Sequence, residues 1–236
     1  MKYQAIIFDL FGTLIDNFPP EEYQRVMAEM ADALSVPHQE FARLWVGTFD
    51  KKASGYFATT REAIEHVCRT LGAKAGEAQI AAAVEIRFGL TRRSLVPRPG
   101  AVETLHHLRA VGHKIGLISD CSAEIPLLWP ETPFAPLIES PVFSCSVGMT
   151  KPDSRIYLLA CERLGVSPKD CLYVADGMGR ELTGAAAVGI SPVLIRVPYD
   201  RDYDHYRLDA KEWPGPVISA LSEVPGLVRS GAIHGA

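Results

Sequence analysis

A short apolar run near the amino terminus ends in a carboxylate, and this junction constrains the fold more than any other feature. Residues 3–8 are rich in β-branched and aromatic side chains, which is typical of a buried strand. Asp9 follows directly, and then come Phe11 and a Gly12–Thr13 turn. Open α/β sheets bind ligands at the carboxyl ends of their parallel strands. Taken alone, Asp9 could equally cap a turn or a helix, so its role depends on what else reaches the same edge.

Strand-like and helix-like runs alternate through the second half of the chain. Helix-like runs at 101–110, 154–164 and 182–188 each end near a glycine. This alternation predicts an α/β fold, a Rossmann-like parallel sheet with helices on its faces. The predicted strands are residues 3–8, 114–119, 141–144, 171–175 and 192–197.

The first hundred residues break this alternation. After Asp16 the chain shows only helix-like runs, at 21–34, 39–46, 61–71 and 77–92. The simplest account is a helical cap domain, residues 17–96, inserted after the first strand of a core domain that comprises residues 1–16 and 97–236. A charged, tyrosine-rich stretch at 199–211 is expected to be a solvated loop.

Composition limits the partners. With 236 residues, 47% of them hydrophobic, the chain can bury a sizeable core. A net charge of -4 without a basic run argues against nucleic acid, and no stretch approaches the roughly 20 apolar residues that span a bilayer. Five cysteines without a CxxC pair suit reduced thiols and a cytoplasmic protein. Nothing in the chain indicates an oligomeric state.

Several polar side chains fall at the ends of predicted strands. Each could have an ordinary role as a turn former, helix cap or surface charge. In a parallel sheet, however, these strand ends share one edge, so the ordered set predicts one crevice that holds all of them. The set comprises Asp9, Asp120 and Asp176, Lys151, and the hydroxyls of Thr13 and Ser119.

The ordered set resembles the four motifs of the haloacid dehalogenase superfamily of hydrolases. The motifs are Asp9-x-Phe11-Gly12-Thr13, Ile118-Ser119, Lys151-Pro152 and Ala175-Asp176-x-x-x-x-Glu181. The resemblance implies that Asp9 is a nucleophile, and that Thr13, Ser119 and Lys151 hold it and the transferring group. Gly12, Ser119, Asp120 and Lys151 are the predicted substrate contacts. Mg²⁺ would lie between Asp9, the backbone carbonyl of Phe11 and Asp176, with Glu181 close by.

These residue types suit phosphoryl transfer. A carboxylate that attacks a phosphate ester faces an anion, so a metal ion and a lysine are needed to neutralise charge. Hard oxygen ligands favour Mg²⁺ over zinc. A covalent aspartyl phosphate would divide one difficult step into two easier ones. The predicted function is therefore Mg²⁺-dependent hydrolysis of a small-molecule phosphate ester.

Phe11 departs from the phosphatase pattern. Phosphatases of the resembled family usually carry a second aspartate there, which protonates the leaving oxygen and then activates water. Phenylalanine can do neither, and a positioned acid/base typically contributes about 10²- to 10⁴-fold. Asp120 is a possible substitute for it. Without one, the predicted phosphatase should be slow.

Three alternatives therefore stay open. Haloacid dehalogenases also lack the second aspartate and release halide, which needs no proton, but they work without metal and their last motif differs from Asp176 and Glu181. Phosphonate-cleaving members use a cap lysine, for which Lys51 or Lys52 is available. A non-catalytic binding or regulatory protein would also explain Phe11, although such a protein need not keep the other charged residues together.

Overall fold

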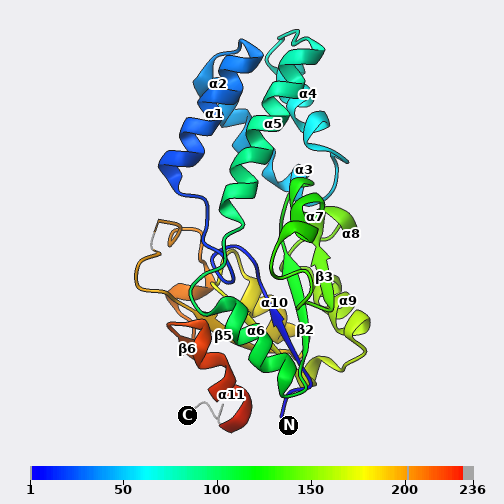
Figure 1. The fold of residues 1–236 in the computed structure, drawn as a ribbon, viewed down its shortest axis with the longest axis vertical. Helices are drawn as coiled ribbons and strands as arrows, with labels where there is room; N and C mark the ends of the chain where they lie inside the picture. Colours follow the sequence, from blue (N-terminus) through cyan, green and yellow to red (C-terminus); the bar gives the residue numbers. More distant parts are fainter. Residues whose placement is uncertain (1, 201, 231–236) are drawn as a thin grey trace.

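A single parallel sheet forms the base of the molecule. The computed structural model describes residues 2–200 and 202–230, and in them six strands pair in the order β3-β2-β1-β4-β5-β6, every neighbour parallel (Figure 1). The predicted Rossmann-like α/β class is confirmed. The strands are β1 (Ala5–Phe8), β2 (Lys114–Ser119), β3 (Ser140–Phe143), β4 (Cys171–Ala175), β5 (Ser191–Ile195) and β6 (Val217–Ile218).

The strand register aligns the predicted site residues. β1 lies between β2 and β4, with Phe8 opposite Leu117 on one side and Val174 on the other. Asp9 continues this ladder, since its backbone N–H donates to the carbonyl of Val174 at 3.0 Å. The ends of these strands therefore meet at one edge. Among the six strands of the described residues, β6 alone was not predicted from the sequence, because a strand of two residues is too short to show a pattern.

Helices cover both faces of the sheet, and the alternation of side chains along β1 explains how. Ile6 and Phe8 join a hydrophobic cluster with Leu105 of the helix Ala101–Ala110, whereas Ile7 joins a second cluster with Ile156 of the helix Ser154–Leu164. Short 3₁₀ turns lie at Trp129–Glu131, Pro168–Asp170, Asp209–Lys211 and Leu221–Glu223. The helices are α6 (Ala101–Ala110), α7 (Glu124–Leu128), α8 (Ser144–Val147), α9 (Ser154–Leu164), α10 (Glu181–Ala187) and α11 (Val224–Ser230).

Residues 17–96, the helical insertion, contain helices only within the described structure and stand beyond one end of the sheet (Figure 1). They share a hydrophobic cluster of their own around the buried rings of Phe41 and Trp45. This separate core supports the predicted domain division, which stays a prediction. No described helix of the chain is long and apolar enough to cross a membrane. The helices of the insertion are α1 (Pro20–Leu34), α2 (His38–Gly47), α3 (Phe49–Ala53), α4 (Thr60–Thr70) and α5 (Glu77–Ser94).

A buried ion pair connects the helical insertion with α7, a helix that follows β2. Arg87 of α5 donates from Nε to Oε1 of Glu124 in α7 at 2.5 Å, and both side chains are almost fully buried. Removing one member of such a pair leaves an uncompensated charge, at a cost of about 3–5 kcal/mol. The pair thereby holds the two parts of the chain in one arrangement.

The prediction of a solvated loop at residues 199–211 is wrong for Arg207 and Asp209. Arg207 is 3% exposed and Asp209 is 8% exposed. Asp209 accepts hydrogen bonds from the backbone N–H groups of Leu182 and Thr183, at 2.8 and 3.0 Å, and so caps the start of α10. Buried polar contacts therefore anchor residues 202–211, which we call the 202–211 segment. The charged composition of this stretch did not show whether its side chains are buried or exposed.

Candidate active site

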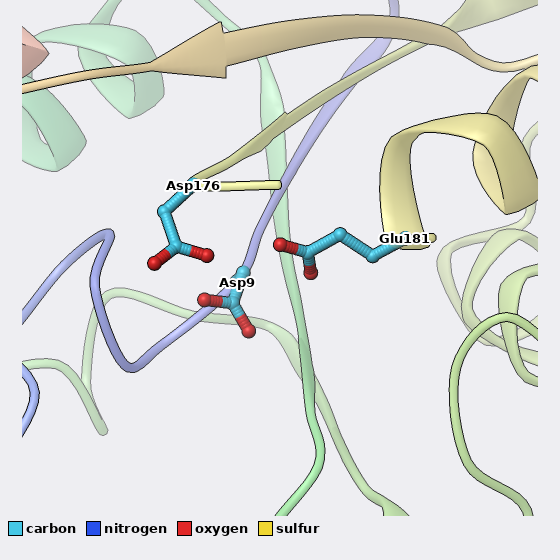
Figure 2. A group of neighbouring side chains, drawn as sticks. All are labelled: Asp9, Asp176 and Glu181. Carbon is cyan, nitrogen blue, oxygen red and sulfur yellow. The ribbon is translucent and has the colours of Figure 1, made fainter. Parts of the chain in front are cut away.

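Three buried carboxylates converge at the carboxyl edge of the sheet. Asp9 follows β1, Asp176 follows β4, and Glu181 begins α10. One oxygen from each lies within 4.8 Å of the others, and Figure 2 shows the three side chains pointing toward one another. The structure thus brings Asp9, near the start of the chain, together with Asp176 and Glu181, which lie far along it.

Lys151 bridges two of these acids. Its Nζ donates to Oδ1 of Asp9 and to Oε2 of Glu181, each at 2.6 Å, and lies 3.3 Å from the hydroxyl of Tyr173. Burial would lower the pKa of Lys151, but the charges of Asp9 and Glu181 outweigh it and raise that pKa well above its ordinary value. Lys151 is therefore a fixed cation against the predicted nucleophile.

Glu181 has no free lone pair to offer. Its Oε1 accepts from the backbone N–H groups of Gly177 and Met178, at 2.9 and 3.0 Å. Its Oε2 accepts from Lys151 and, at 2.8 Å, from the hydroxyl of Tyr173. We infer that Glu181 holds Lys151 in place and leaves direct contact with a cation to the other two acids.

The environment of Asp9 and Asp176 favours a bound cation. Burial, only partly offset by Lys151, raises the pKa of Asp9 to about 6. Burial and the charge of Glu181 raise the pKa of Asp176 to about 6, against the opposing effect of Arg207. Closely spaced buried carboxylates repel one another, and hard oxygen donors fit Mg²⁺. The residues present therefore suit the metal ion that the sequence predicted.

Two hydroxyls at the same edge are unpaired. Thr13 and Ser119 are fully buried, and neither hydroxyl has a hydrogen-bond partner within the described residues. An unsatisfied buried hydroxyl costs about 1–3 kcal/mol. Both groups are thus free to donate to the oxygens of a bound substrate, and their predicted contact with the transferring group stays a prediction.

The turn that follows Asp9 needs a glycine at residue 12. Gly12 has a φ of 76°, and a Cβ at this residue would lie 2.0 Å from Oδ2 of Asp176. Its carbonyl accepts a hydrogen bond from the buried guanidinium of Arg98. Gly12 therefore lets the loop that carries Asp9 approach Asp176 closely, whereas its predicted contact with substrate stays a prediction.

The carboxylate of Asp120 binds the backbone of the loop that carries Lys151, a contact that the sequence did not predict. Both of its carboxylate oxygens lie 3.1 Å from the backbone N–H of Lys151 and accept from it. Burial raises the pKa of Asp120. The contact fixes the loop that carries the lysine, and roles in substrate binding or proton transfer stay predictions.

Phe11 faces the helical insertion. Its half-buried ring packs on Phe18 with centroids 5.1 Å apart, and Phe18 in turn packs on Tyr23 of α1 at 5.7 Å. The guanidinium of Arg87 lies 5.0 Å from the centroid of Phe18. Phe11 thus begins an aromatic contact between the nucleophile loop and the insertion, a role that an aspartate could not perform.

Three functional side chains were missed in the sequence. Arg207 donates from Nε to Oδ2 of Asp176 at 2.8 Å, Arg98 reaches the carbonyl of Gly12, and Tyr173 contacts Lys151. Arg98 lies next to the predicted exit of the insertion, which was the available signal for it. Arg207 lies in the charged stretch 199–211, where nothing in the sequence distinguished it from its solvated neighbours.

The helical insertion packs closely against the residues that follow β2, around a small gap. Trp45, Lys52 and Thr60 line it on one side, and Ser122 and Glu124 on the other. The Nζ of Lys52 lies 3.8 Å from the centroid of the Trp45 ring and donates to the Trp45 carbonyl at 2.6 Å. Of the two lysines considered from the sequence, Lys52 is the buried one.

The buried amine should make stability depend on pH. Burial, reinforced by Arg87 and opposed by Glu124, lowers the pKa of Lys52 to about 7. The unfolded chain keeps this proton until about pH 10, so unfolding takes up a proton between pH 7 and 10 and its free energy rises with pH. From pH 7 to 9 the parent should gain on the order of 2 kcal/mol over Lys52→Met in urea unfolding.

The exposed neighbour provides the control. Lys51→Met removes the same charge from an exposed position and leaves Lys52 buried, so this variant should show the same gain in stability with pH as the parent. Parallel pH profiles for the parent and Lys52→Met would show that Lys52 stays charged in the folded protein.

The chain resembles known hydrolases in sequence, and it shares its fold with a solved structure. The sequence pattern of the haloacid dehalogenase-like hydrolases matches residues 3–189. (S)-2-haloacid dehalogenase 4A of Burkholderia cepacia is 27% identical over 81% of this chain and 82% of its own length. The glyceraldehyde 3-phosphate phosphatase of Methanopyrus kandleri is 26% identical over 82% and 84%. The 2-haloacid dehalogenase of Pseudomonas syringae has the same fold, with a TM-score of 0.71, 22% identity and coverage of 98% and 100%.

Proposed function

This chain belongs to the haloacid dehalogenase-like hydrolases, and we propose that it hydrolyses a small phosphate ester with Asp9 as nucleophile and Mg²⁺ as cofactor. The observation that carries the proposal is that the buried carboxylates of Asp9 and Asp176 lie close together, where both could bind one cation. Lys151 is held against Asp9 beside them. A phosphatase relative supports the choice of substrate class.

Each residue has a part in the proposed reaction. The carboxylate of Asp9 attacks phosphorus, and the bond from phosphorus to the ester oxygen breaks. Lys151 and the unpaired hydroxyls of Thr13 and Ser119 hold the phosphoryl oxygens. Water then attacks the aspartyl phosphate, which releases inorganic phosphate and restores the Asp9 carboxylate.

Mg²⁺ would be held by Asp9, Asp176 and the backbone carbonyl of Phe11, and when bound it supplies positive charge for the phosphoryl group. The leaving alkoxide takes its proton from solvent, because the ring of Phe11 offers none. Substrates with good leaving groups should therefore react fastest. The helical insertion would select among them as a cap over this edge.

A second candidate is hydrolytic dehalogenation of a 2-haloacid. Phe11 favours it, since halide leaves without a proton, and a dehalogenase is among the relatives. In this case Asp9 displaces halide from carbon, and water hydrolyses the resulting ester. Lys151 and Arg207 would supply the positive charge at the site.

One assay separates the two candidates. The purified chain is offered a panel of phosphate monoesters and 2-haloacids, with Mg²⁺ or with chelator, and release of phosphate and halide is measured. We expect phosphate release that falls at least about 100-fold on chelation, because the charge supplied by the metal is lost.

Two results would contradict the favoured proposal. Phosphate release that chelator leaves unchanged would remove the metal from the mechanism. Halide release without phosphate release would make the dehalogenase the better assignment.

A further inference from the structure

Arg207 forms a buried ion pair with the candidate metal ligand Asp176. Its Nε donates to Oδ2 of Asp176 at 2.8 Å, and the two side chains are 3% and 1% exposed. The Asp176 side chain points toward Asp9 and Glu181 (Figure 2), and its other oxygen, Oδ1, accepts from the backbone N–H of Met178 at 3.1 Å. A guanidinium thus lies against a carboxylate that is also positioned for a divalent cation.

The guanidinium is held there independently of Asp176. Its terminal nitrogens donate to Oδ2 and the carbonyl of Asp200, at 2.7 and 2.9 Å, and to Oδ1 of Asp204 at 3.0 Å. Three groups outside the acidic site therefore fix the position of Arg207. A side chain with this many partners is preorganised, and it acts on Asp176 as a permanent charge.

The charge of the site depends on this residue. Asp9, Asp176 and Glu181 carry three negative charges when ionised, and Lys151 and Arg207 return two positive ones. Without Arg207 the net charge facing a cation would be more negative by one. Arg207 acts on a bound cation in two ways: it neutralises Asp176, which would attract the cation, and it repels the cation directly. Both effects are strong because the charges are close together and buried, where screening by salt and water is weak.

The same contacts reach the loop of the nucleophile. Asp200 also accepts from Arg98, and Arg98 donates to the carbonyl of Gly12 and, at 2.6 Å, to Asp16. The charges alternate from Asp16 through Arg98, Asp200 and Arg207 to Asp176. A continuous chain of ion pairs and hydrogen bonds therefore connects Arg207 with the turn that follows Asp9.

We propose that Arg207 is an internal competitor of the divalent cation: its guanidinium neutralises Asp176 and thereby weakens Mg²⁺ binding at the acidic site. This inference rests on the proposed function, because it takes Mg²⁺ as the cation of that site. Arg207 therefore acts on the metal through Asp176 and not by direct contact. It sets the Mg²⁺ concentration at which the acidic site becomes occupied.

Calorimetric titration of Mg²⁺ into substrate-free protein tests the proposal. Arg207→Gln, which can still donate a hydrogen bond but carries no charge, should bind Mg²⁺ about 10-fold or more tightly than the parent. Arg207→Lys keeps the charge and should stay close to the parent. A purely structural role would instead impair both variants, and weaker binding by Arg207→Gln would overturn the proposal.

Arg196→Gln is the matched control. Arg196 pairs with Asp204 at 2.8 Å, and Arg207 pairs with the same carboxylate at 3.0 Å. Arg196 is 36% exposed, however, and its pair with Asp204 lies outside the contact with Asp176. Its removal lowers the local positive charge by the same amount. The Mg²⁺ affinity of this variant should match the parent, and an equal gain would show only a general charge effect.

Hydrogen exchange on the parent keeps the proposal testable if Arg207→Gln does not fold. Linkage is reciprocal, so if Arg207 weakens Mg²⁺ binding, Mg²⁺ must weaken the hold of Arg207 on Asp176 by the same factor. Saturating Mg²⁺ should therefore speed exchange in the 202–211 segment. Slower or unchanged exchange there would contradict the proposal.

The outcomes separate this inference from the proposed function. A Mg²⁺-dependent phosphatase whose affinity does not change in Arg207→Gln refutes the inference alone. A parent that works without metal, together with Mg²⁺ binding that emerges only in Arg207→Gln, refutes the proposed cofactor and upholds the competition. Absence of Mg²⁺ binding in both proteins refutes both.

Discussion

Asp9→Asn is expected to reduce turnover of the parent's substrate at least about 1,000-fold, because an amide oxygen is too weak a nucleophile to displace an alkoxide or a halide. The change removes one charge from a crowded buried site and keeps the side-chain shape. Lys151 retains its contact with Glu181. The melting temperature should therefore stay close to that of the parent, so that lost activity reports on chemistry.

The measurement is initial-rate kinetics with the substrate that the panel identifies, supported by mass spectrometry of the quenched parent. The parent should carry a covalent adduct on the peptide that contains Asp9, and Asp9→Asn should not. Asp153→Asn is the matched control, since Asp153 is an acid that caps α9 at the surface. Activity of Asp9→Asn within 10-fold of the parent would exclude nucleophilic catalysis by Asp9.

Phe11→Asp is expected to raise phosphatase turnover by about 10- to 100-fold, since it introduces the general acid and base that the chain lacks. The expected gain is smaller than the full contribution of a positioned acid, because the new carboxylate joins a site that already holds three. The change also removes the packing of Phe11 on Phe18. We expect a loss of about 1–2 kcal/mol in the free energy of unfolding.

Phe11→Asn is the control for this packing loss, because it has nearly the same shape as aspartate and cannot transfer a proton. Turnover should rise in Phe11→Asp relative to Phe11→Asn, and most for substrates with poor leaving groups. Equal turnover in the two variants would show that proton transfer does not limit the parent. If the chain is a dehalogenase, halide release should not rise in Phe11→Asp.

The two predictions together address why an acid and an aromatic ring lie two residues apart. Asp9 points into the acidic site, whereas Phe11 contacts the helical insertion. A gain of function in Phe11→Asp with a loss of stability would mean that this chain has given up proton transfer for a contact between its two parts. The position would then report on the arrangement of the insertion as well as on chemistry.

The order of strands and helices could be predicted because hydrophobic period and punctuation are local properties. β1, β2 and β4 lie within two residues of their predicted bounds. The edge of the sheet that carries the site also followed from sequence, since all the strands were expected to be parallel. Asp9, Asp176 and Lys151 therefore met as expected.

The partners of these residues could not be predicted. Glu181 was expected near the metal, yet its four hydrogen bonds hold Lys151 and the turn after β4. Arg207 was assigned to a solvated loop, although it is buried against Asp176. Charged side chains look alike in a sequence whether they are solvated or paired, because pairing depends on residues that are distant in the chain.

The sequence by itself determined the α/β architecture, the inserted helices and the set of reactive groups at one sheet edge. These follow from periodicity and from the rule that parallel strands end together. Only the tertiary structure decided which oxygens remain free for a cation, which hydroxyls are unpaired and which arginine faces Asp176. The physical reason is that electrostatic free energy depends on burial and on distances of a few ångströms, and these are set by the packing of the whole chain.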